Sequence, residues 1–267
     1  MVLKMYSIMT ALSNYKKTIE NNFSKRAHLY DEYANIQYLT ACELIEGLPP
    51  DGVINILEIG CGTGNYTRLL KKKFNNAHIK ALDKSRNVVE IAKKKLKNED
   101  IEFVVADAEK SSLGGGFDLI TSNAALQWFA DLERWIEKCK NALTEKGVIS
   151  FSTFGPLTFR ELGYSLKEAM GKDLAIPAAN FLCLDEIAAI LARHFKERAV
   201  REHIIKEKFS SLAELLNKIR CTGARGGALD NIFLWKRNIF ERAEGIYRQR
   251  FGKIEATYQI FFCKALL

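Results

Sequence analysis

One short segment, Leu57–Thr67, constrains the fold of this chain more than any other part of it. A continuous apolar run, Val53–Ile59, has the length and the β-branched content of a buried strand. Glycines follow at positions 60, 62 and 64, and a helical pattern comes directly after them. Because glycine lacks a Cβ atom, such a turn can approach a ligand closely and direct backbone N–H groups toward it. The segment therefore predicts an α/β fold with a ligand site at the end of this strand.

Strand and helix patterns alternate through the first half of the chain. Short apolar runs predict further strands at 79–83, 101–106, 117–122 and 148–153. Helical patterns lie between them at 66–74, 85–96 and 131–143, with Ser85 and Asp131 as expected N-caps and Lys146-Gly147 as the expected end of the third helix. This alternation indicates βαβ units, a parallel sheet and helices on both of its faces.

The second half departs from this alternation. Strand patterns at 199–209 and 257–263 bring the expected sheet to seven strands, mostly parallel. The helical stretches 157–182 and 210–252 are expected to be insertions at the end of the sheet, forming a lid. We predict a single domain over 1–267, in which helices within 1–45 cover the ligand and 53–154 form the core that binds it.

An acidic residue at the end of the second strand narrows the class of ligand. Asp83 lies 19 residues after Gly64, where a carboxylate can accept hydrogen bonds from both hydroxyls of a ribose. The glycines follow a G-x-G-x-G spacing, and no glycine lies three residues after Gly62, as the dinucleotide fingerprint requires. The spacing therefore disfavours a cofactor that contains a pyrophosphate.

The form Glu58-x-Gly-x-Gly-x-Gly resembles motif I of the class I S-adenosylmethionine-dependent methyltransferases. The resemblance implies a Rossmann-like fold, S-adenosyl-L-methionine as methyl donor and S-adenosyl-L-homocysteine as its product. In that family an acidic residue after the third strand, here Asp107, contacts the adenine amino group, and the next backbone amide, at Ala108, contacts a ring nitrogen. The residues expected to bind the cofactor are Phe23, Lys25, Tyr30, Glu58, Gly60, Cys61, Gly62, Gly64, Asp83, Lys84, Asp107, Ala108 and Asn123.

Further motifs are similar to the malonyl-acyl-carrier-protein methyltransferases of biotin synthesis. Phe23–Gln37 resembles the N-terminal element of that family, with Lys25 where the family usually has arginine. Ala124–Trp128 matches its A-L-Q-W motif, Ser152–Leu162 its S-T-x-G-P element, and Ala256–Tyr258 its C-terminal A-T-Y. These motifs occur in the family's order and span nearly the whole chain.

The resemblance implies methyl transfer to the free carboxylate of a malonyl thioester carried by acyl-carrier protein or coenzyme A. The methyl ester masks a charge, so that fatty-acid enzymes can extend the chain toward pimeloyl. A carboxylate, with an ordinary pKa of about 4, is already ionised at neutral pH and needs no general base. The protein has only to align the reacting atoms and exclude water.

The acceptor carboxylate requires a cation or several hydrogen-bond donors. The expected substrate-binding residues are Arg160, Phe181, Lys218 and Arg220, with Arg225 as a further candidate cation. Tyr30 and Gln127 are the expected catalytic residues, bordering the path of methyl transfer. The alternative interpretation makes Tyr30 a core aromatic that covers the cofactor and assigns Gln127 to helix packing.

The charge of the chain favours an acidic partner. The net charge is +8, and residues 193–253 hold fifteen Lys and Arg against seven Asp and Glu. A basic rim around the lid could steer an acidic acyl-carrier protein, although a solvated basic face without a partner has the same composition. We expect no nucleic-acid or membrane partner and a monomer.

Composition excludes several other classes of protein. No apolar run reaches the roughly 18 residues of a membrane helix, and the N-terminus lacks the clean apolar run of a signal peptide. The six scattered cysteines form no Cys-x-x-Cys pair, which suits a reduced cytoplasm and gives no support for a metal site.

The alternatives that stay open are a methyltransferase for another small carboxylate or a quinone precursor, an RNA methyltransferase, and a non-catalytic assembly factor.

Overall fold

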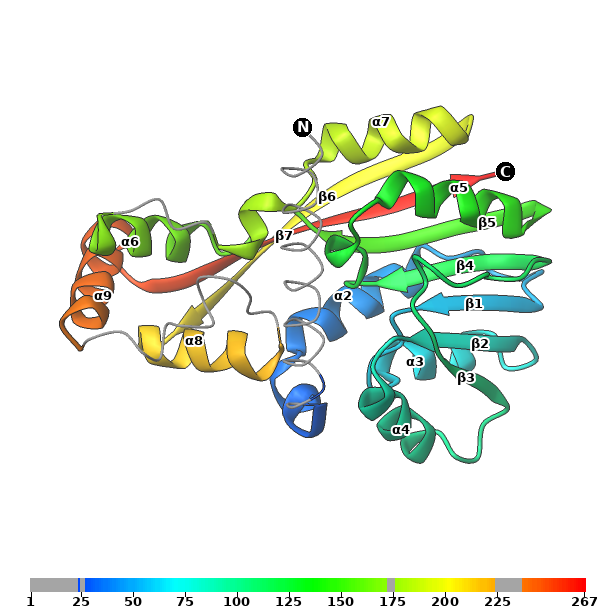
Figure 1. Cartoon of the computed structure of the whole chain (residues 1–267), viewed down its shortest axis with the longest axis horizontal. Helices are drawn as coiled ribbons and strands as arrows, with labels where there is room; N and C mark the ends of the chain where they lie inside the picture. Colours follow the sequence, from blue (N-terminus) through cyan, green and yellow to red (C-terminus); the bar gives the residue numbers. More distant parts are fainter. Residues whose placement is uncertain (1–23, 25–26, 172–175, 224–236) are drawn as a thin grey trace, which may run out of the picture.

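The computed structural model describes residues 24, 27–171, 176–223 and 237–267, and the structural statements below concern these residues. Phe23, Lys25 and Arg225, which the sequence analysis assigns to the site, lie outside them. Figure 1 shows a twisted sheet and, at its far end, a smaller lobe of helices gathered around two long strands. None of the described helices is both long and apolar enough to cross a membrane.

The sheet has seven strands in the order β3-β2-β1-β4-β5-β7-β6, which confirms the predicted sheet. β1 to β5 run parallel, and β7 is antiparallel to both of its neighbours. The chain order reverses between β1 and β4, and open α/β sheets bind ligands at such a point. The strands are β1 (Asn55–Ile59), β2 (His78–Asp83), β3 (Ile101–Val105), β4 (Phe117–Asn123), β5 (Leu143–Phe154), β6 (Glu197–Phe209) and β7 (Ile254–Leu266).

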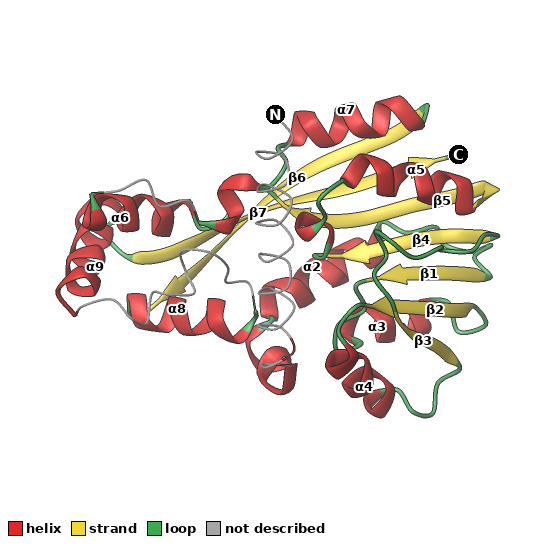
Figure 2. Cartoon of the chain, viewed as in Figure 1, coloured by secondary structure: helices red, strands yellow, loops and turns green. Residues whose placement is uncertain are grey.

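Helices cover both faces of the sheet, as predicted, and each face has its own apolar core (Figure 2). On one face the buried side chains come from α2 (Asn35–Glu46), α3 (Asn65–Lys73) and α4 (Arg86–Lys95). On the other they come from α5 (Leu132–Ala142) and α7 (Leu184–His194), around the fully buried Trp135. The carboxyl ends of β1 to β4 remain open between these two layers.

The lobe is built on the outer half of the β6–β7 ribbon. Its helices are α6 (Arg160–Met170), α8 (Leu212–Cys221) and α9 (Arg237–Phe251), and α6 packs against α9. Tyr247 of α9 is fully buried, and its hydroxyl donates a hydrogen bond to the Glu255 carbonyl oxygen at 2.6 Å. Buried side chains of the lobe and of one sheet face form one continuous cluster. The division into a single domain with a lid stays a prediction.

The helix predicted over 131–143 is α5, which ends at Ala142, one residue before the predicted bound. Lys146-Gly147, expected to end it, lies within β5 instead, because Leu143 is already extended and pairs with Phe117 of β4. Ser85 precedes α4 at the expected N-cap position, but its side chain makes no capping hydrogen bond to the helix. The expected cap at Asp131 is confirmed, since its side chain accepts from the Arg134 N–H at 2.9 Å.

Candidate active site

The glycine loop after β1 is held tightly against a second loop. Gly60, Gly62 and Gly64 all have positive φ, at 71°, 53° and 84°. A Cβ atom on Gly60 would lie 2.5 Å from the Cβ of Ala125, a distance that real side chains do not reach. Around Gly62, by contrast, a Cβ atom would meet nothing within 4 Å. Gly60 thus permits the close packing of the two loops, and Gly62 borders an open cavity.

Asp83 supports this loop from the end of β2. Its Oδ2 accepts the Gly62 N–H at 3.0 Å, and its Oδ1 accepts the Ser85 N–H at 2.8 Å. Each carboxylate oxygen has two acceptor sites, so one backbone N–H does not exhaust the acceptor capacity of either oxygen. The carboxylate lines the cavity with its orientation already fixed.

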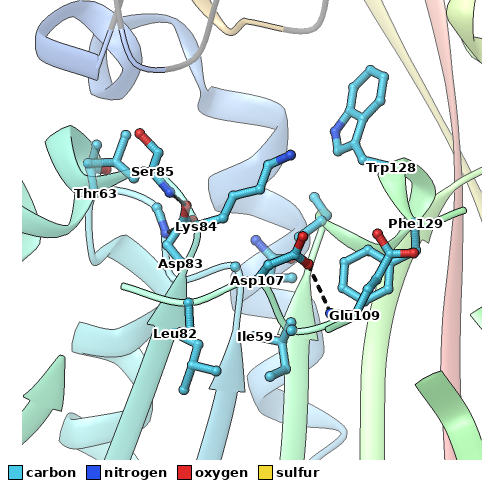
Figure 3. A pocket seen from close by; sticks show the side chains of 18 of the residues that line it. Ile59, Thr63, Leu82, Asp83, Lys84, Ser85, Asp107, Glu109, Trp128 and Phe129 are labelled. Atoms are coloured by element: carbon cyan, nitrogen blue, oxygen red, sulfur yellow. Dashed lines mark hydrogen bonds between the residues drawn. The ribbon is translucent and has the colours of Figure 1, made fainter. Parts of the chain in front are cut away.

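The opposite wall of this cavity is suited to a flat base. Asp107 follows β3, and its Oδ1 accepts the Glu109 N–H at 3.0 Å (Figure 3). Apolar side chains of Leu82, Val88 and Phe129 line the same cavity as the two acidic residues. In Figure 3 the Lys84 side chain extends from the end of β2 toward Trp128.

Most of the residues expected to bind the cofactor meet at this one cavity, which we call the nucleoside cavity. Tyr30, Gly60, Gly62, Asp83, Lys84, Asp107, Ala108 and Asn123 line it. Cys61 lines a smaller neighbouring hollow. Glu58, in β1, and Gly64, directly before α3, are not among the described residues that line these cavities.

A second cavity adjoins the first, and we call it the acceptor cavity. Tyr30, Ala124 and Trp128 line both, so the two spaces meet at these residues. The acceptor cavity has aromatic walls, in which the rings of Trp128 and Phe181 meet edge to face with centroids 5.3 Å apart. Lys218 of α8 also lines it. The structure therefore places a cavity lined by Asp83 and Asp107 next to a mostly apolar pocket with a buried cation.

The expected substrate residues divide between the cavity and the surface. Phe181, Lys218 and Gln127 line the acceptor cavity. Arg160 does not belong to its described lining; half exposed, it pairs with Glu161 at 3.2 Å. Arg220 likewise lies outside that lining and donates to Asn217 Oδ1 at 2.5 Å. Lys218 is therefore the best placed of these three cations.

Sequence reasoning missed several lining residues. Gln37 and Tyr258 line the acceptor cavity and fall within the motifs Phe23–Gln37 and Ala256–Tyr258, so their motif membership was an available signal. Thr158 and Thr222 line it too. Thr158 falls within the Ser152–Leu162 element, so its motif membership was a signal too, whereas Thr222 lies outside the motifs named above and reaches the cavity through the packing of the lobe.

Comparison with known proteins agrees with this arrangement. Residues 56–147 match a family model described as a methyltransferase domain. The malonyl-[acyl-carrier protein] O-methyltransferase 2 of Ilyobacter polytropus is 37% identical over 254 residues, covering 92% of this chain and 96% of that protein. A malonyl-[acyl-carrier protein] O-methyltransferase of Acetivibrio thermocellus is 33% identical, covering 92% of each chain. This chain belongs to the malonyl-[acyl-carrier protein] O-methyltransferase family.

Solved structures share the fold of this methyltransferase. The YcgJ protein of Bacillus subtilis superposes with a TM-score of 0.61 at 13% identity, covering 85% of this chain and 97% of its own. An S-adenosylmethionine-dependent methyltransferase of Thermotoga maritima gives a TM-score of 0.56 at 16% identity, covering 93% and 99%. The predicted Rossmann-like class I methyltransferase fold is confirmed.

In this methyltransferase the helical segment 27–33 is tied to the glycine loop by Asp31. Its Oδ1 accepts from Thr63 Oγ1 at 2.6 Å and from Asn65 Nδ2 at 2.9 Å, and its Oδ2 accepts from Lys95 Nζ at 2.5 Å. Burial opposes ionisation of Asp31, but the hydrogen bonds and the charge of Lys95 outweigh it and lower its pKa. The ionised carboxylate thus holds Tyr30 beside both cavities.

Tyr30 itself is suited to donate a hydrogen bond and not to act as a base. Burial, reinforced by the negative charges of Asp31 and Asp83, raises the pKa of its hydroxyl well above the usual value. The hydroxyl therefore keeps its proton at neutral pH.

Glu58 is a buried residue of β1, the strand that leads into the glycine loop. Neither of its oxygens has a hydrogen-bond partner among the described residues. Burial, reinforced by the charge of Asp83, raises its pKa from 4.5 to about 8. At neutral pH the folded protein therefore keeps Glu58 mostly protonated, whereas the unfolded chain ionises it.

The substitution Glu58→Gln is expected to remove a pH dependence of stability. The unfolded chain releases the Glu58 proton near pH 4.5 and the folded protein only near pH 8. The contribution of Glu58 to the free energy of unfolding is therefore fully present below pH 4.5. It falls by about 1.4 kcal/mol per pH unit between pH 4.5 and about pH 8. Chemical denaturation of both proteins at about pH 5 and pH 8 measures this, and an equal slope in the variant would contradict the buried, protonated state.

Proposed function

We propose that this protein transfers a methyl group from S-adenosyl-L-methionine to the free carboxylate of a malonyl thioester. The observation that carries the proposal is the junction of the two cavities at Tyr30, Ala124 and Trp128. A nucleoside cofactor and an acyl acceptor bound in these cavities would meet at that junction. The relatives named malonyl-[acyl-carrier protein] O-methyltransferase support the choice of acceptor.

The residues present fit the proposed cofactor. Asp83 would offer its two oriented carboxylate oxygens to a ribose, Asp107 would offer an acceptor to an exocyclic amino group, and apolar side chains line the same cavity. The open side of Gly62 leaves room for a ligand against the loop backbone. When bound, S-adenosyl-L-methionine supplies an electrophilic methyl group on a sulfonium sulfur.

The chain itself has little chemistry to perform. The acceptor carboxylate is the nucleophile, so no proton moves in the transfer. Tyr30 stays protonated and can orient the carboxylate as a hydrogen-bond donor. The Gln127 amide is fixed by its hydrogen bond to the Ala124 carbonyl oxygen at 2.7 Å, which holds the junction in shape. Positioning and the exclusion of water therefore account for catalysis.

The lobe suits the role of a lid in this reaction. Lys218 of α8 and Thr222, directly after that helix, line the acceptor cavity, as does Phe159, directly before α6. The backbone N–H of Phe159 donates a hydrogen bond to the Thr257 carbonyl oxygen at 2.7 Å, which holds Phe159 in place. Such walls would keep water from the reacting atoms.

Growth of a biotin auxotroph tests this function in a cell. We expect the gene to restore growth without biotin in bacteria that lack their malonyl methyltransferase. A variant with Asp83→Ala should not restore growth. Failure of the unaltered gene, with soluble protein present, would favour the alternative acceptors: another small carboxylate or a quinone precursor.

We also propose acyl-carrier protein as the partner, a cytoplasmic location and a monomer. The six free cysteines are consistent with a reducing compartment. Exposed arginines on α9, such as Arg242 and Arg250, give the lobe a basic surface. An acidic carrier would be steered toward it.

Charge reversal on this surface is expected to separate the two possible carriers. Arg242→Glu should reduce kcat/KM for malonyl-acyl-carrier protein by about tenfold at low salt, with less effect near 0.5 M salt because exposed charges are then screened. Malonyl-coenzyme A should be affected much less. Lys146→Glu, an exposed change at the amino edge of the sheet, is the control. Equal losses with both substrates would place the docking surface elsewhere.

A further inference from the structure

The cation of the acceptor cavity already has a carboxylate partner. Lys218 Nζ donates to both side-chain oxygens of Glu207, at 2.5 Å each, and also to Asn35 Oδ1. The two charged side chains are only 8% and 20% exposed. The ammonium group also lies 5.8 Å from the ring centroid of Phe209 and 5.9 Å from that of Tyr258. It is therefore a desolvated cation whose charge is balanced by Glu207.

Glu207 is held as firmly as the lysine. Its Oε1 accepts from Asn35 Nδ2 at 2.9 Å, and its Oε2 accepts from the Tyr258 hydroxyl at 3.1 Å. The four residues come from β6, α8, α2 and β7, so no single element can shift without disturbing the pair. Lys218 and Tyr258 line the acceptor cavity, whereas Glu207 lies outside its described lining and balances the charge of the lysine through the ion pair.

We propose that Glu207 is a specificity-determining residue, which neutralises Lys218 so that the acceptor cavity admits a carboxylate without trapping it. This inference rests on the proposed function. In the transfer an anionic carboxylate becomes a neutral ester, so the negative charge on the acceptor decreases on the way to the transition state. An uncompensated lysine would therefore stabilise the bound substrate more than the transition state, which tightens binding and slows the reaction. A cavity with net negative charge would instead repel the substrate.

The net charge of the pair can be varied in three steps. Glu207→Gln removes the carboxylate while keeping a side chain that can bond Asn35 and Tyr258. Lys218→Met removes the cation, and the double variant removes both groups. For a malonyl thioester we expect KM to be lowest in Glu207→Gln and highest in Lys218→Met, with the double variant between the two single variants. Glu207→Gln should also lower kcat by about tenfold, because Lys218 without its carboxylate partner would stabilise the bound substrate more than the transition state.

Two controls separate charge from damage to the fold. Glu202→Gln makes the same change on the same strand, where the carboxylate accepts from Gln259 Nε2 at 2.5 Å outside the acceptor cavity, and should leave KM unchanged. Asn35→Asp adds a negative charge beside the same ammonium group while keeping the Glu207 side chain, although it removes the hydrogen bond from Asn35 Nδ2 to Glu207, and should raise KM. This second variant keeps the test open if Glu207→Gln does not fold.

Binding of a neutral ligand completes the test. The inhibition constant of the malonyl thioester methyl ester should hardly vary across the variants, because this product carries no carboxylate.

The proposal is overturned if the double variant is as impaired in KM as Lys218→Met, or if ester and acid respond alike. Unaltered protein that binds S-adenosyl-L-homocysteine but never methylates a malonyl thioester would refute the proposed function, and this inference with it. Methylation without the expected order of KM would refute only the inference.

Discussion

Replacing Asp83 with alanine is expected to weaken binding of S-adenosyl-L-homocysteine by about 100-fold or more. The carboxylate can offer a ribose two charge-assisted hydrogen bonds, each contributing roughly 1.5–3 kcal/mol. Its loss also leaves the Gly62 and Ser85 N–H groups without the acceptor that now orients the loop. Calorimetric titration with S-adenosyl-L-homocysteine measures the effect directly.

Asp118→Ala is the matched control for this result. The Asp118 carboxylate also accepts two backbone N–H groups, those of Ile54 at 3.0 Å and Asn55 at 2.9 Å, but at the start of β1, remote from the cavities. It should lose stability without losing affinity. If Asp83→Ala retains its affinity while folded, the nucleoside cavity is not the cofactor site.

Gly60→Ala should destabilise the fold and remove cofactor binding together. The added Cβ atom would lie 2.5 Å from the Cβ of Ala125, at a residue whose φ is 71°. Overpacking typically costs about 1–3 kcal/mol, and a left-handed backbone conformation about 1 kcal/mol more. We therefore expect the free energy of unfolding to fall by about 2–4 kcal/mol in urea denaturation.

A second substitution separates the two causes. Adding Ala125→Gly removes the colliding methyl group and should recover the larger part of the loss, leaving about 1 kcal/mol from the backbone. No recovery at all would show that the close approach of the two loops is not what requires glycine at position 60.

The parts of this molecule that sequence could predict are those fixed by local pattern. The glycine loop, Asp83 and Asp107 lie at strand ends, and the order of strands along a βαβ chain determines that strand ends meet. The buried strand pattern of Val53–Ile59 placed the loop on the sheet, and β1 confirmed it.

The remaining features depend on contacts between distant segments. β5 begins at Leu143 because that residue pairs with Phe117, which no local signal records. β6 and β7 extend beyond their predicted bounds because they pair with each other over their whole length.

The same limit applies to the acceptor cavity. Sequence named Arg160, Lys218 and Arg220 as candidate cations and favoured Lys218 and Arg220 by their place on the lid, but it could not choose between those two. Only the packing of α8 against β6 joins Lys218 to Glu207, whereas Arg160 lies half exposed beside Glu161.

Transfer of an isotopically labelled methyl group to malonyl-acyl-carrier protein tests the central claim most directly. Purified protein is incubated with labelled S-adenosyl-L-methionine and the carrier loaded with malonyl or, as a control, with acetyl. Mass spectrometry of the released acyl group should show one labelled methyl ester on malonyl and none on acetyl, which has no free carboxylate. Absence of label on malonyl, in protein that binds S-adenosyl-L-homocysteine, would contradict the account.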